Sequence, residues 1–326
     1  MQYKIFTAAA LSLATLPAYA QSNVSIYGLL DSALVMSQGG PSGTTTKLES
    51  GVSNGSRIGF RGTEDLGNGM SALFTLEAGL LLDTGASDQN GTLFGRQAYT
   101  GLKGNFGAVT MGRQYTPIYN TLVQVDPFSN NYGGAAGQLM AGEKAGTRMN
   151  NTVMYATPTL QGFSAQAAYG FGEVAGNSAK SRQIGGSVSY EAGRLLLRGA
   201  FNRTTNATAT DSARNVLLIA KYDFGPVIGS IGYGDNKGTG LTDSRDYIVG
   251  VTVPFGVQSL MANAVHKTDR ANTHLGANQL ALVYSYALSK RTNWYMGAAK
   301  LSNTRFTTTK FGAGDTEYDL GIKHTF

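Results

Sequence analysis

The sequence predicts an all-β protein that crosses a membrane as an antiparallel β-barrel of about sixteen strands. From Val24 onward, segments of roughly ten residues alternate apolar and polar side chains, which is the period of a β-strand. Short turn signals alternate with longer polar stretches, as in a barrel with tight turns at one end and long loops at the other. After Leu16 no apolar run approaches the ~20 residues of a membrane-spanning helix, and the mean hydropathy is −0.13.

The beginning of the chain is expected to be a signal peptide, residues 1–20, that is removed. Lys4 supplies the positive start, residues 8–16 are apolar, and residues 18–20 form an A-x-A cleavage site. The mature protein, residues 21–326, is then a single barrel domain, because a closed barrel is one continuous sheet. The 326 residues carry a formal net charge of +6 and no cysteine, which excludes disulfides and thiolate metal sites.

The segment at residues 279–288 shows the strand alternation most clearly. Leu280, Leu282, Tyr284 and Tyr286 lie on one face, and small or polar residues occupy the other. In a membrane barrel one face of each strand contacts lipid and the other faces the lumen. The face that carries the aromatic residues is therefore assigned to lipid.

One connection, at residues 115–148, is much longer than the others and shows no clear alternation. Loops of this length are usually functional or disordered, so an exposed, mobile loop is one interpretation. The presence of Pro117, Leu122, Pro127 and Phe128 is more typical of a segment that packs against a surface. We therefore expect this loop to lie inside the barrel against its wall.

The alternation continues to the last residue of the chain. Tyr318, Leu320, Ile322 and Phe326 lie on one face of the terminal segment. Such an end resembles the signal that outer-membrane barrels present to the barrel assembly machinery, which is therefore an expected partner.

Several motifs resemble those of the Gram-negative general porins of the proteobacterial type, and the match covers nearly all of the mature chain. These motifs are residues 24–28, 56–69, 95–99, 112–115, 150–155, 288–292 and the final Phe326. The resemblance implies a homotrimer in the bacterial outer membrane, with one water-filled pore per subunit and lipid and lipopolysaccharide around it. Small hydrophilic solutes and ions would diffuse passively through each pore, and the third long loop would fold inward to form a constriction.

In such porins a ladder of basic residues on the wall faces acidic groups on the inward loop. The matching residues here are Arg57, Arg61, Arg96, Arg113 and Arg148 for the ladder, and Asp126 and Glu143 for the loop. Alternation independently puts Arg57 and Arg61 in the lumen, because Ile58 and Phe60 take the other face. Other interpretations remain: the arginines could bind lipopolysaccharide phosphates or pair at the rim, and Asp126 could cap a turn.

By position in the motifs, Arg57 and Arg61 lie on the second strand, Arg113 ends the fifth and Arg148 begins the sixth. At the expected constriction, arginines outnumber acids. The sequence therefore predicts a weak preference for anions. In a narrow pore an ion passes within one Debye length, ~8–10 Å, of the wall charges, so salt screens their effect on it poorly. A substrate-selective channel for small organic anions is an alternative with the same architecture.

Two further classes of function are alternative hypotheses. A structural or adhesive barrel would use its extracellular loops, such as residues 204–214 and 236–244, to bind a partner. An outer-membrane hydrolase would need a histidine near a serine, but His266, His274 and His324 are far apart and lack a nucleophile motif. We therefore expect no enzymatic activity, no cofactor, no dedicated metal site and no nucleic-acid partner.

Overall fold

The computed structural model describes residues 23–40, 43–140, 146–239, 243–271, 276–302 and 315–326. The expected signal peptide, Glu143 and His274 lie outside the described residues. Within the described residues, no helix is both long and apolar enough to cross a membrane.

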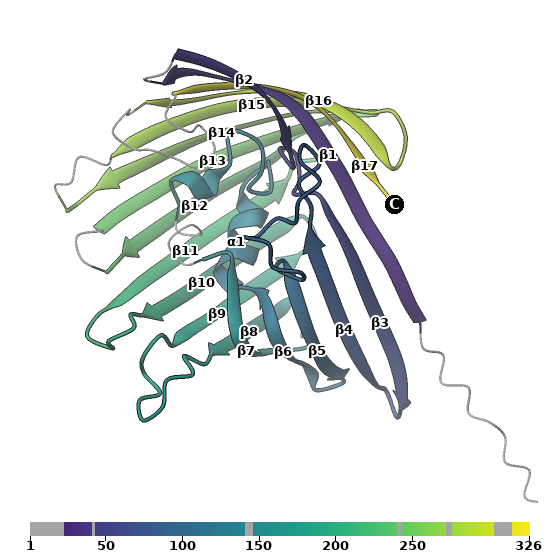
Figure 1. Ribbon diagram of the computed structural model, residues 1–326, viewed down its shortest axis with the longest axis vertical. Helices are drawn as coiled ribbons and strands as arrows, with labels where there is room; N and C mark the ends of the chain where they lie inside the picture. The colour runs from purple at the N-terminus through teal and green to yellow at the C-terminus, as the bar shows by residue number, and fades with distance from the viewer. Residues whose placement is uncertain (1–22, 41–42, 141–145, 240–242, 272–275, 303–314) are drawn as a thin grey trace, which may run out of the picture.

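In the described part of the chain, seventeen strands form one closed sheet in which neighbouring strands pair in an antiparallel manner (Figure 1). The strands are β1 (Asn23–Gly40), β2 (Gly43–Ser50), β3 (Arg57–Gly67), β4 (Met70–Gly79), β5 (Gln97–Gly104), β6 (Gly107–Tyr115), β7 (Arg148–Ala156), β8 (Phe163–Gly170), β9 (Gln183–Ala192), β10 (Leu195–Thr205), β11 (Ser212–Asp223), β12 (Ile228–Lys237), β13 (Asp243–Phe255), β14 (Gln258–Asp269), β15 (Ala277–Ala287), β16 (Thr292–Ser302) and β17 (Thr316–Thr325). The predicted all-β barrel is confirmed, with one strand more than the sixteen expected.

The extra strand arises because the second strand of the wall is split. The 18-residue β1 pairs with β2 through its second half and with β3 through its first half. Between β2 and β3, residues 51–56 leave the wall and contact groups inside the barrel. The Ser53 Oγ donates to the Tyr132 hydroxyl at 2.8 Å, and the Asn54 N–H donates to the Asp31 carboxylate at 2.6 Å. Counted as one wall strand, β2 and β3 restore a sixteen-stranded barrel.

The barrel closes where the last strand returns to the first. The register of β17 on β1 runs from Leu29 opposite Thr325 to Gln38 opposite Thr316. The backbone groups of Gly28 and Phe326 exchange two hydrogen bonds of 3.1 Å each. Every strand of the membrane-spanning wall therefore has partners, as lipid requires of any backbone that crosses it.

The outward face of the wall has the composition of a lipid-facing band. Leu218, Ile231, Val249 and Leu280, on β11, β12, β13 and β15, are each more than half exposed. Two aromatic pairs belong to the same outward face, Tyr222–Phe224 beside the tight turn at Gly225 and Tyr233–Tyr247 on β12 and β13. Outward aromatic residues beside an apolar band are typical of membrane barrels.

The largest apolar core lies between the inner loop and the wall. The loop joins β6 to β7 and contains α1 (Pro117–Val125) and the short 3-10 helix η1 (Ala136–Gln138), and Figure 1 shows α1 within the barrel. Helix α1 begins at Pro117 after Thr116, whose side chain accepts the Tyr119 N–H at 3.1 Å. Its buried side chains join those of the wall in one cluster, which includes Ile118, Leu122, Val125, Leu217, Ile219 and Ile248.

Polar side chains of β12, β14 and β15 donate hydrogen bonds to backbone carbonyl groups of the inner loop. Ser230 of β12 donates to the Val125 carbonyl at 2.6 Å. Asn263 of β14 and Gln279 of β15 both donate to the Gly134 carbonyl, at 2.9 and 2.6 Å. The loop is therefore fixed against one side of the barrel, and space remains on the other side.

We expect Gly28→Ala to impair closure of the barrel. An added Cβ would lie 2.5 Å from the Phe326 ring and 2.6 Å from the Arg57 carbonyl oxygen, which belongs to the wall and cannot rotate away. Overpacking of this kind costs about 1–3 kcal/mol. The yield of the compact, heat-modifiable barrel on unboiled SDS gels should fall. Gly229→Ala is a matched control, since its Cβ would meet only a Phe224 ring atom at 3.4 Å, and equal yields would contradict this prediction.

Candidate functional site, a constriction with three arginines

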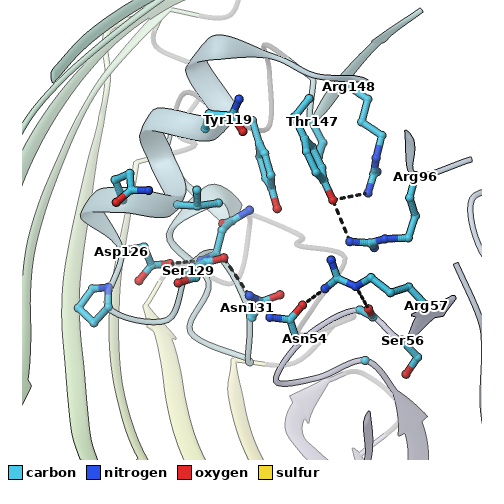
Figure 2. Close-up of a pocket in the computed structure, with 18 of the residues that line it drawn as sticks. Asn54, Ser56, Arg57, Arg96, Tyr119, Asp126, Ser129, Asn131, Thr147 and Arg148 are labelled. Atoms are coloured by element: carbon cyan, nitrogen blue, oxygen red, sulfur yellow. Dashed lines mark hydrogen bonds between the residues drawn. The ribbon is translucent and has the colours of Figure 1, made fainter. Parts of the chain in front are cut away.

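A cavity of about 770 Å³ lies between the inner loop and the opposite wall. Arg57, Arg96 and Arg148 line one side of it, while Tyr119 and Asp126 belong to the loop across from them (Figure 2). Arg57 begins β3, Arg96 directly precedes β5 and Arg148 begins β7. The closed sheet brings together three arginines that are far apart in the sequence.

A buried carboxylate on β4 organises two of these arginines. Glu77 is 3% exposed, and its carboxylate lies 2.8 Å from the Arg96 Nε and 3.8 Å from the Arg57 Nη1. The Tyr27 hydroxyl also donates to it, at 3.0 Å. One negative charge therefore faces two positive charges, which leaves this group with a net positive charge.

Tyr115 connects the arginines to the inner loop. Its hydroxyl accepts hydrogen bonds from Arg96 at 2.8 Å and from Arg148 at 3.4 Å. The Arg148 guanidinium also lies 4.9 Å from the centre of the Tyr115 ring. Tyr119 of α1 stacks on the same ring with 5.1 Å between the centroids. Among the ion pairs of the described residues, none includes Arg148, so it adds a second net positive charge to the cavity wall.

Arg57 is positioned by the segment that splits the second wall strand. Its guanidinium donates to the Gly55 carbonyl at 3.0 Å and to the Asn54 side chain. Both partners are neutral, so these contacts orient the arginine without cancelling its charge. The inward turn of residues 51–56 thus decides where this charge lies.

Asp126 lines the cavity, but its carboxylate serves the fold of the loop. It ends α1 and accepts hydrogen bonds from the backbone N–H groups of Phe128, Asn130 and Ala136 and from the Asn263 side chain, at 2.8 to 3.1 Å. Burial raises the pKa of Asp126 to about 6, although these hydrogen bonds oppose the shift. The sequence left open whether this residue faces the constriction or caps a turn. In the structure its carboxylate accepts the hydrogen bonds of the turn after α1, and the residue also belongs to the cavity lining.

Two other members of the sequence-predicted ladder are not part of the cavity lining. Arg61 is on the same face of β3 as Arg57 but four residues further, about 13 Å along the strand. It donates to the Ser25 Oγ at 3.3 Å and does not appear among the described residues that line the cavity. Arg113 donates to the Gly95 carbonyl at 2.7 Å and also lies outside that lining. The acid predicted at position 143 is outside the part of the chain that the structure describes.

Sequence reasoning did not identify Glu77, Tyr115 and Tyr119 as parts of this site. A signal for Glu77 was present, because it is the one acid in residues 70–79, which are otherwise mostly apolar. A lone carboxylate on a membrane strand needs the lumen side and a basic partner. No comparable pattern distinguishes Tyr115 or Tyr119 from the many other tyrosines of the chain.

The two histidines among the described residues each bond a side chain on a neighbouring strand. His266 bonds Asn278 at 2.6 Å and His324 bonds Thr292 at 2.9 Å, on separate strands. No group of three potential metal ligands occurs in the part of the chain that is described.

A closed barrel that is narrowed from within by a docked loop, with charged side chains around the remaining space, defines a pore-forming protein of the bacterial outer membrane. The family model for Gram-negative porins matches residues 7–305, and the chain belongs to this family. It is an outer-membrane porin, a water-filled channel for the passive diffusion of small hydrophilic solutes and ions. The family consists of channels rather than enzymes.

The chain is similar over nearly its whole length to known outer-membrane porins. It is 30% identical to outer membrane porin protein 32 of Delftia acidovorans, over 99% of each chain. It is 28% identical to an outer membrane porin protein of Bordetella pertussis, over 100% of each. Among solved structures, the anion-selective porin from Comamonas acidovorans has a TM-score of 0.82 and 29% identity, and covers 94% of this chain and 100% of its own.

We expect Asp126→Asn to remove a pH dependence of the inner loop. With its pKa near 6, against 3.8 for a free aspartate, Asp126 holds a proton more tightly when the loop is docked. Docking therefore becomes stronger as the pH falls from about 6 to 3.8, and does not change outside that window. As the pH falls through this window, single-channel current fluctuations in planar bilayers should decrease in the wild type but not in this variant.

Asp88→Asn is the matched control, since Asp88 lines the same cavity but does not hold the loop. It should keep the wild-type response to pH. A wild-type channel with no response, or a full response in Asp126→Asn, would contradict the assignment of this acid to loop docking.

Proposed function

We propose that the channel prefers anions over cations, and that Arg57, Arg96 and Arg148 set this preference. The observation that carries the proposal is the charge imbalance at the cavity, where Glu77 pairs with both Arg57 and Arg96 and no ion pair among the described residues includes Arg148. An anion in a water-filled space of this size passes within a Debye length, ~8–10 Å, of the charges on its wall. Screening by salt is then incomplete, and anions are favoured.

Glu49, Asp88 and Asp126 also line the cavity and offset these cations in part, while Lys221 adds a fourth cation to the lining. Glu49 is paired with Lys47 at 2.8 Å. Asp126 directs its carboxylate to donors within the loop and to Asn263. The similar solved porin from Comamonas acidovorans is described as anion-selective, which also supports the proposal.

The basic ladder that the family resemblance implies is broader than this cluster. We propose that Arg61 and Arg113 act at most as secondary charges along the path of the solute, since neither lines the described part of the cavity. For the loop acids, Asp126 would position the loop, and Glu143 stays a prediction.

We further propose that the subunits form homotrimers in a membrane that contains lipopolysaccharide, and that the protein acts as a channel alone, without enzymatic activity. The C-terminal residues Tyr318, Leu320, Ile322 and Phe326 would be the signal for the barrel assembly machinery. The first three share the exposed outward face of β17, which supports such a role. Sedimentation of detergent-extracted protein should show trimers, and a monomer at all concentrations would contradict the assembly.

We expect the double variant Arg57→Gln/Arg148→Gln to shift the reversal potential in a KCl gradient toward cations. Screening over a Debye length of ~8–10 Å leaves each of two unit charges about 8 Å from an ion with about 0.2 kcal/mol. The sign is opposite for an anion and a cation, so the anion-to-cation permeability ratio should fall about fourfold. Arg96 remains in both proteins, so that Glu77 is not left buried without a partner.

The control is Arg61→Gln/Arg113→Gln, which removes the same charge from two ladder residues outside the cavity lining. Its permeability ratio should change less than twofold. An unchanged ratio in the first double variant, or an equal fall in both, would show that the three-arginine cluster does not set selectivity.

A further inference from the structure

Three cations stand side by side at one rim of the barrel, away from the pore. Arg203, Arg214 and Lys237 lie on the adjacent strands β10, β11 and β12, and the strand register places Arg214 directly opposite both of the others. They line a recess of about 260 Å³ together with Asp211 and Ser212. Like charges in directly opposed positions destabilise a sheet, so this row needs an anion to offset it.

The three side chains face outward, toward the membrane. Arg203 shares its strand face with Phe201, and Arg214 shares its face with Leu218, and both of these apolar residues are exposed. The residue that follows Arg214, Asn215, is fully buried on the other face of the wall. The recess is therefore on the lipid side of the wall and separate from the conduction path.

The row lies at the height where the apolar band ends. Arg214 and Tyr222 are eight residues apart on one face of β11, which is about 27 Å along the strand and about 20 Å across the membrane at the usual tilt. Tyr222 belongs to the aromatic row beside the tight turn at Gly225. Tight turns face the periplasm in such barrels and longer loops face the exterior, so Arg214 lies at the level of the outer-leaflet headgroups.

The neighbouring acids on the rim are already engaged by other cations. Asp235 lies 3.5 Å from Arg245 and 3.1 Å from Arg270, and Asp243 also pairs with Arg270. None of the ion pairs found among the described residues includes Arg203, Arg214 or Lys237. Asp211 is the one carboxylate among the described residues that line the recess, so their charge is three positive against one negative.

We propose that Arg203, Arg214 and Lys237 bind a phosphate group of an outer-leaflet lipid, namely a phosphate on the glucosamine headgroup of lipopolysaccharide. A guanidinium presents two parallel N–H groups that match phosphate oxygens, and a lysine adds a point charge. The exposed apolar side chains below the row contact the acyl chains of the same lipid. The site depends on the outer-membrane location of the barrel and is independent of its anion preference.

The test is binding of diphosphoryl lipid A to the purified protein in detergent. Arg214→Gln should weaken binding about fivefold, the contribution expected of one basic residue near an anionic lipid surface. Arg245→Gln is the matched control, because it removes an outward-facing arginine from the same rim that is already paired with Asp235. It should change binding less than twofold. Both variants should keep the wild-type reversal potential, which shows that the barrel is folded and separates this test from that of selectivity.

Two further probes identify the source of the phosphate. Dephosphorylated lipid A should bind the wild type about as weakly as diphosphoryl lipid A binds Arg214→Gln, and inorganic phosphate should not displace the lipid at comparable concentration. Equal weakening by Arg245→Gln, equal binding of both lipids, or displacement by inorganic phosphate would each overturn the proposal. If Arg214→Gln does not fold, Arg203→Gln tests the same row with the same expected loss.

Discussion

A sheet that spans lipid must satisfy all of its backbone groups internally, and this constraint underlies the rest of the structure. Here β17 returns to β1 and closes the wall, with Gly28 and Phe326 joined by two backbone hydrogen bonds. A closed barrel of this size has a lumen too wide for the side chains of its own wall to fill. The loop between β6 and β7 supplies the missing packing, since Ile118 and Leu122 are completely buried against the wall.

The docked loop and the wall then divide the lumen unequally. Serine, asparagine and glutamine side chains from β12, β14 and β15 hold the loop to one side by its carbonyl groups. On the other side, Glu77 fixes Arg57 and Arg96 from within the wall, and Tyr115 links Arg96 and Arg148 to the loop. Removing one partner from a buried ion pair is strongly destabilising, so the same contacts stabilise the wall and maintain the positive charge of the pore.

Arginines on the two faces of the wall have different surroundings. Inside, the guanidinium groups are oriented by neutral acceptors and one carboxylate, which leaves net charge beside the water-filled space. Outside, the register of three strands brings Arg203, Arg214 and Lys237 into one row above the apolar band. The alternation of side chains along a strand separates these two sets completely, because neighbouring residues point to opposite faces.

Alternation and turn signals were sufficient to determine the fold class, since both are local properties of the chain. The pattern in residues 279–288 anticipates β15, and the long unpatterned segment anticipates the inner loop. Alternation also put Arg57 and Arg61 on the lumen face, but it carries no information on height within the barrel. Only the closed sheet decided that Arg57 lines the cavity and Arg61 lies about 13 Å away, that Glu77 sits between two arginines, and that residues 51–56 turn inward. These features depend on strand register and on contacts between distant segments, which no local pattern encodes.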